Sequence, residues 1–155
     1  MHLDYAWIAA HIPHQGAMCL IDEVLDWSAT EISCRTASHR LASNPLRTAD
    51  RLRAECGIEY AAQAMAIHGV LNAASHSASP AAGMLASVRG VTLHVDRLDN
   101  IADDLLIRGT RISGDATALL YDFSISREST TLLSGRATIL LRAPSVTSTV
   151  VQSNP

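Results

Sequence analysis

The sequence is poor in aromatic residues, which make up only 4% of its 155 positions. It is also poor in charge: acidic and basic residues together account for 17%, and the net charge is -3. Nucleic-acid-binding proteins usually carry a basic surface, so this balance argues against nucleic acid as a partner. The lack of a basic run argues equally against binding to an anionic membrane. Because 48% of residues are hydrophobic, a core built mainly from Leu, Ile, Val and Ala is expected.

No targeting segment and no cysteine pair are expected either. The opening MHLDYAWIAAHIPH has no Lys or Arg and predicts no signal peptide, and no segment is long and apolar enough to span a bilayer. Cys19, Cys34 and Cys56 are an odd number without the spacing of a metal site. We therefore expect small buried thiols in a reducing compartment, which favours a cytoplasmic location.

Several catalytic signatures are absent from the chain. It contains no phosphate-binding glycine loop, no Gly-x-Ser-x-Gly and no Cys with an evident His partner. No metal site is expected. The length predicts one domain over residues 1–143, and the Ser- and Thr-rich residues 144–155 are expected to form a C-terminal tail.

Hydrophobic periodicity predicts one long helix from about Leu52 to Ala73, with Thr48 or Asp50 as its N-cap. The helix is rich in Ala and Gly, so other elements can approach it closely, which favours a central position. Strand-like segments precede it at 18–28 and 31–38 and follow it at 84–95, 104–113, 116–126 and 131–142, with a tight turn at Gly114 and Asp115. This order predicts an α+β fold with an antiparallel sheet packed on the helix.

Glu59 is the first candidate for chemistry, because it lies in the middle of the predicted helix with Gln63 one turn later. In an apolar cavity its carboxyl group would lose solvation and hold its proton more tightly, which suits a general acid. The alternative is a solvated helix face that exposes Glu55, Glu59 and Gln63 together.

His14 is the second candidate, in the turn IPHQG before the first strand. A histidine there can serve as a general base, or it can simply bond to a carbonyl of the turn. His68 follows Glu59 by nine residues and is expected on the opposite face of the helix, packed or exposed.

Together these segments resemble the hotdog fold of the β-hydroxyacyl-acyl-carrier-protein dehydratases. IPHQGAMCLIDEVLDW resembles that family's Leu-Pro-His-Arg opening, IEYAAQAMAIHGVL its central helix, GMLASVRGVTLHV the strand after the helix, and SGRATILL the closing strand. More narrowly, PHQGAM, GIEYAAQAMAIHG and LASVRGV resemble a divergent ApeP-like branch that accompanies aryl-polyene and related lipid or polyketide gene sets. The resemblance covers roughly residues 8–142 and implies a long central helix wrapped by a curved antiparallel sheet of five to six strands.

The resemblance implies a hydro-lyase that converts a 3-hydroxyacyl thioester to a trans-2-enoyl thioester in fatty acid or aryl-polyene biosynthesis. The substrate is carried on the phosphopantetheine of an acyl carrier protein, and no other cofactor is implied. Glu59 falls on the family's catalytic carboxylate, and Gln63 on its glutamine. Gly57, Met65, Leu85 and Val88 join Gln63 as predicted substrate-binding residues, the last three lining an acyl tunnel. Arg89 is interpreted as a charge at the sheet edge.

The chain departs from the family at the usual catalytic histidine, which lies in a His-Phe-Pro-Gly segment. Here that stretch reads SHRLASNPLRTADRLRAE, with Asn44 and Pro45 in place of His-Phe-Pro and only His39 nearby. His14 is the natural substitute as general base, and a distance to Glu59 above about 10 Å would exclude it.

Alternatives therefore remain: a non-catalytic partner subunit of a heteromeric hotdog dehydratase, or an acyl thioesterase. A hotdog sheet alone leaves an exposed edge strand, so a homodimer or higher oligomer, or a second hotdog subunit, is expected.

Overall fold

A computed structural model describes residues 3–142 of the chain. The helices are α1 (Tyr5–His11) and α2 (Gly57–Ser75), with short 3-10 turns η1 (Gly16–Met18), η2 (Ser38–Arg40) and η3 (Ala54–Cys56). The strands are β1 (Glu23–Trp27), β2 (Glu31–Thr36), β3 (Ala82–Leu93), β4 (Leu105–Gly114), β5 (Ala118–Arg127) and β6 (Thr130–Arg142). Within this range no helix has the length and apolar character needed to cross a membrane.

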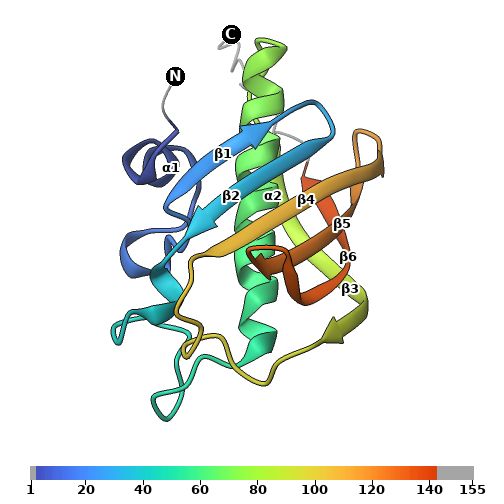
Figure 1. Cartoon of the computed structure of the whole chain (residues 1–155). Coiled ribbons are helices and arrows are strands. Elements are labelled where there is room, and N and C mark those ends of the chain that lie inside the picture. The colour runs from blue at the N-terminus through green and yellow to red at the C-terminus, as the bar shows by residue number, and fades with distance from the viewer. Residues whose placement is uncertain (1–2, 143–155) are drawn as a thin grey trace, which may run out of the picture.

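The six strands form one antiparallel sheet in the order β1-β2-β4-β5-β6-β3. Figure 1 shows this sheet curving across α2, with α1 beside β1. The arrangement is the predicted hotdog fold, with six strands around one long central helix.

The core lies between α2 and the inner face of the sheet. Small residues Ala61 and Ala64 and the larger Tyr60 and Ile67 of α2 are buried there. Gly57 marks the tightest approach, because a Cβ at this position would lie 2.8 Å from a Leu133 methyl group on β6. The small residues of the helix thus let the sheet close against it, as the sequence indicated.

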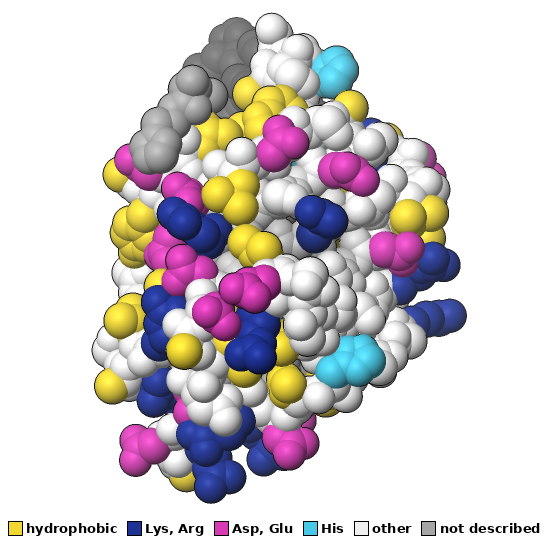
Figure 2. All heavy atoms as spheres, in the orientation of Figure 1, with side chains coloured by type: hydrophobic (Ala, Val, Ile, Leu, Met, Phe, Trp, Pro, Cys, Tyr) yellow, Lys and Arg dark blue, Asp and Glu magenta, His cyan; other side chains and the backbone are white. Residues whose placement is uncertain are grey.

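The opposite face of the sheet carries many charged side chains. Figure 2 shows Arg and acidic side chains interspersed there, with only scattered hydrophobic spots. Arg136 on β6 donates to Asp122 on β5 at 2.8 Å, one of several exposed ion pairs. An interspersed surface of this kind is typical of a face that meets water, so the sheet has a single covered face.

The start of the long helix was predicted wrongly. The α-helix begins at Gly57 after a 3-10 turn, and neither Thr48 nor Asp50 caps it. The preceding segment pairs instead with the chain after β3: Leu52 N–H donates to Asp99 at 2.8 Å, and Leu98 N–H donates to the Leu52 carbonyl at 2.8 Å. These tertiary hydrogen bonds hold the segment extended, against its local helical pattern.

Two further predictions need correction at the N-terminus. The expected strand over residues 18–28 is shorter, because η1 occupies its first residue and β1 begins only at Glu23. Helix α1 was not predicted, although Asp4 caps it by accepting the N–H of Trp7 at 3.0 Å. The remaining five strands agree with the sequence to within two residues. The predicted tail, residues 144–155, lies outside the described residues.

Candidate active site

His14 and Glu59 meet within a single chain. His14 Nε2 lies 3.1 Å from Glu59 Oε1, and the two side chains are 27% and 32% exposed. This is hydrogen-bond distance, far inside the limit of about 10 Å set for a joint role. The contact also argues against the simpler alternative for each residue: Glu59 is not on a fully solvated face, and His14 does not merely bond within its turn.

The opening turn brings His14 to the helix. Helix α1 ends at His11 because Ile12 precedes a proline and adopts extended dihedral angles. Gly16 then turns the chain with a φ of +56°, a conformation that favours glycine. Tyr5 donates from its hydroxyl to the Gly16 carbonyl at 3.2 Å, which ties the turn to α1. The proline and the glycine of IPHQG therefore shape a loop that presents His14 to α2.

The two ring nitrogens of His14 have different surroundings. Its Nδ1 is buried without a hydrogen-bond partner among the described residues, whereas Nε2 faces Glu59. Nε2 is therefore the nitrogen through which His14 contacts the carboxyl group of Glu59.

Gln63 lies next to this pair and is fully buried. Its Nε2 donates to Glu59 Oε1 at 3.1 Å and to the Met18 carbonyl at 2.7 Å, while its Oε1 accepts the N–H of Leu20 at 2.9 Å. Both N–H groups of the amide are thus used inside the chain. Direct binding of substrate by Gln63 stays a prediction, and these contacts favour a role in holding Glu59.

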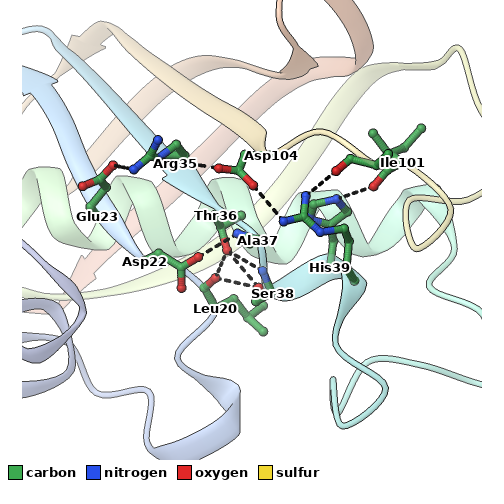
Figure 3. A network of polar contacts seen from close by, with 12 residues as sticks. Leu20, Asp22, Glu23, Arg35, Thr36, Ala37, Ser38, His39, Ile101 and Asp104 are labelled. Atoms are coloured by element: carbon green, nitrogen blue, oxygen red, sulfur yellow. Dashed lines mark hydrogen bonds and ion pairs between the residues drawn. The ribbon is translucent and has the colours of Figure 1, made fainter.

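A buried polar network lies behind Gln63 and was missed from the sequence. The Leu20 carbonyl accepts from Thr36 at 2.5 Å and from Ser38 at 2.7 Å, and Figure 3 shows both hydroxyls converging on it. Ser38 Oγ lies 2.8 Å from the hydroxyl of Tyr60, which also accepts from Asn44 at 2.9 Å. Polar residues before and within an apolar helix were the available signal, but their pairing depends on the tertiary fold.

Asn44 occupies the segment where the resemblance led us to expect a catalytic histidine. It is 6% exposed and anchors that segment to α2 through Tyr60. Burial raises the pKa of Tyr60, so its hydroxyl stays protonated. The segment therefore serves as a structural anchor in this chain.

Two other histidines, His39 and His68, are buried and bonded within the fold. His39 lies in η2 with its Nε2 3.0 Å from the Ile101 carbonyl, and Figure 3 shows its ring turned to that loop. His68 packs on the far side of α2, 2.7 Å from the Tyr121 hydroxyl, as its spacing from Glu59 indicated. Burial lowers the pKa of both rings, so both are neutral near pH 7.

Thiol and metal chemistry find no support among residues 3–142. All three cysteines are free, and burial raises the pKa of Cys34 to about 12. A thiol that holds its proton so tightly is not a nucleophile near neutral pH. Within the same range no three His, Cys, Asp or Glu side chains gather as ligands for a metal ion.

The remaining predicted substrate residues lie on α2 and β3. Met65 is 4% exposed on α2, while Leu85 and Val88 are half-buried on β3. Gly57 packs on Leu133 at the start of α2. Three hollows on the described part of the chain are lined by other side chains, so an acyl tunnel along Met65, Leu85 and Val88 stays a prediction.

Known structures share this fold. The dehydratase heterocomplex ApeI:P from Xenorhabdus doucetiae matches with a TM-score of 0.77 at 20% identity, covering 88% of this chain and 91% of that one. A hypothetical thioesterase with coenzyme A from Streptococcus pneumoniae matches at 0.57 and 12% identity, covering 78% and 85%. A mutant thioesterase from Pseudomonas aeruginosa matches at 0.61 and 12% identity, covering 89% and 93%.

No curated protein matches the chain. The sequence pattern of the ApeP-like family, described as ApeP dehydratase, matches residues 6–151, which is nearly the whole sequence. The chain therefore belongs to the ApeP-like family of hotdog dehydratases.

Proposed function

We propose that this protein is a 3-hydroxyacyl-acyl-carrier-protein dehydratase that uses His14 and Glu59 as its acid–base pair. The 3.1 Å contact between His14 Nε2 and Glu59 Oε1 carries the proposal. The family supports dehydration as the reaction, and the thioesterases of the same fold are consistent with a thioester substrate.

The proposed reaction needs one proton acceptor and one donor. His14 removes the proton from carbon 2, the bond between carbon 3 and its hydroxyl breaks, and Glu59 protonates the departing hydroxyl to give water. Carbons 2 and 3 are adjacent, so two groups at hydrogen-bond distance can serve both. The proton on His14 then returns to Glu59 across the 3.1 Å contact, which restores the pair.

The long free edge of β3 supports assembly with a second hotdog chain. Within residues 3–142, β3 is the last strand of the sheet and pairs with β6 alone, and it exposes Met84, Val91 and Leu93. A long apolar edge of this kind invites strand pairing. The partner is a second copy or a different hotdog subunit, and the Xenorhabdus relative is itself a heterocomplex. We place the protein in the cytoplasm, where its free thiols remain reduced.

The test is incubation with a 3-hydroxyacyl carrier protein, followed by mass spectrometry of the acyl group for loss of water. We expect turnover by the wild type and at least a 100-fold loss in Glu59→Gln and His14→Gln. Glu55→Gln is the matched control, because Glu55 lies one turn earlier and makes only an exposed ion pair with Arg53.

Two other outcomes identify the alternatives. Turnover that begins only when another hotdog protein is added indicates a partner subunit, the reading favoured by the heterocomplex. Release of free acid from an acyl thioester indicates a thioesterase, the reading favoured by the structural neighbours.

A further inference from the structure

The orientation of the Gln63 amide is fixed by the backbone. The Leu20 N–H can only donate, so it requires the oxygen of the amide, and the Met18 carbonyl can only accept, so it requires the nitrogen. The second N–H of that nitrogen is then directed at Glu59 Oε1. Since Gln63 is fully buried, no water competes for these positions.

Leu20 is also held through its carbonyl group. Its carbonyl accepts from Thr36 and Ser38, and Ser38 in turn rests on the Tyr60 hydroxyl. Tyr60 follows Glu59 directly in α2. The series of hydrogen bonds therefore runs from Glu59 through Gln63, Leu20 and Ser38 to Tyr60, and both of its ends lie on the same helical turn. A movement of Gln63 therefore breaks several buried hydrogen bonds at once.

We propose that Gln63 is the positioning residue of the acid–base pair: it holds Oε1 of Glu59 at its contact with His14 Nε2. The proposal rests on the dehydratase function above. Oε1 meets both His14 Nε2 and Gln63 Nε2, each at 3.1 Å, so the same amide that is fixed by the backbone also fixes the oxygen that contacts His14.

The first test replaces the amide by a side chain of similar length that cannot donate. Gln63→Met is expected to lower kcat on the order of 10- to 100-fold with KM unchanged, because a displaced carboxyl group costs rate and not affinity. His68→Met is the matched control: His68 is another fully buried polar residue of α2, on the far face. It should lower the melting temperature similarly and leave kcat unchanged.

The second test uses pH. In Gln63→Glu the introduced carboxyl group can make one of the two donations of the amide when protonated, and places a negative charge beside Glu59 when ionised. Glu59 contacts the position directly, and His14 lies one contact further. The ratio of variant to wild-type kcat should therefore fall as pH rises, while the ratio for Gln63→Met stays constant. A constant ratio for both variants, or a kcat loss in His68→Met equal to that in Gln63→Met, overturns the proposal.

A readout without turnover separates this proposal from the function itself. The melting temperature of Gln63→Glu relative to wild type should fall with rising pH, and Glu59→Gln in the same chain should abolish that fall. If the wild type dehydrates no thioester but this coupling is present, the proposed reaction is wrong and Gln63 still holds Glu59. If the coupling is absent, the positioning role is wrong whatever the reaction.

Discussion

Replacing Gly57 by alanine tests the contact that sets the helix against the sheet beside the site. An added Cβ would lie 2.8 and 2.9 Å from the two methyl carbons of Leu133. Unstrained carbon contacts are about 3.5–4.0 Å long, so one of the groups must move. Leu133 is fully buried and cannot turn toward solvent, so the start of α2 or the strand β6 must shift.

The magnitude follows from two opposing effects. Overpacking in a core costs about 1–3 kcal/mol, and Gly→Ala in a helix returns at most about 1 kcal/mol. We therefore expect Gly57→Ala to lower the free energy of unfolding by about 1 kcal/mol. Gly69 lies in the same helix, and a Cβ added there would meet nothing within 4 Å, so Gly69→Ala should raise it by about 0.5–1 kcal/mol.

Urea unfolding at one fixed protein concentration measures both variants. Their midpoints should move in opposite directions from wild type, because the substitution is the same and only the space around it differs. If Gly57→Ala stabilises the protein as Gly69→Ala does, the packing argument fails. If Gly57 instead acts by binding substrate, as the sequence predicted, the variant should raise KM without loss of stability.

Three further substitutions test other parts of the fold. Because burial lowers the pKa of His68, stability should fall as pH drops below 6.5, and His68→Gln should reduce this dependence in urea titrations to the part that His39 contributes. Gly16→Ala forces a side chain to a φ of +56°, so we expect a loss of about 1 kcal/mol and a lower kcat through displacement of His14. Arg97 holds the pKa of Asp99 at about 2, below the ordinary value of 3.8. The stability that this carboxylate contributes is therefore complete above pH 3.8 and is lost as pH falls from 3.8 toward 2. Asp99→Ala leaves the Leu52 N–H unpaired and should cost about 1–3 kcal/mol near pH 7, measured by thermal unfolding.

The strands and the body of the helix could be predicted because their signals are local. Alternating apolar residues located β3 to β6 within two positions, since each strand buries one face. The helix start could not be predicted in the same way. Residues before Gly57 pair with Asp96 and Leu98, about 45 positions along the chain, and these hydrogen bonds override the local periodicity.

In the site, too, the residue types could be predicted from local sequence, but their contacts could not. Glu59 and His14 could be named from residue type and resemblance, but their contact depends on a glycine turn and on a helix that no local pattern revealed. Gln63 was assigned to substrate because it falls on the glutamine of the family's helix, one turn after the catalytic carboxylate. Its burial follows from two backbone groups, at Met18 and Leu20, whose positions the sequence does not encode locally.

The intrachain contact of His14 and Glu59 leads to a prediction about assembly. The dehydratases that this chain resembles usually combine a histidine and a carboxylate from different subunits, whereas here both come from one chain. A mixture of His14→Gln and Glu59→Gln chains should therefore stay inactive: in any mixed dimer, each chain retains only half of its own pair. If activity returns on mixing, the functional pair forms between subunits, and the 3.1 Å contact is not the catalytic one. Mixing each variant with wild type supplies the control, because a wild-type chain keeps its own complete pair whatever its partner carries.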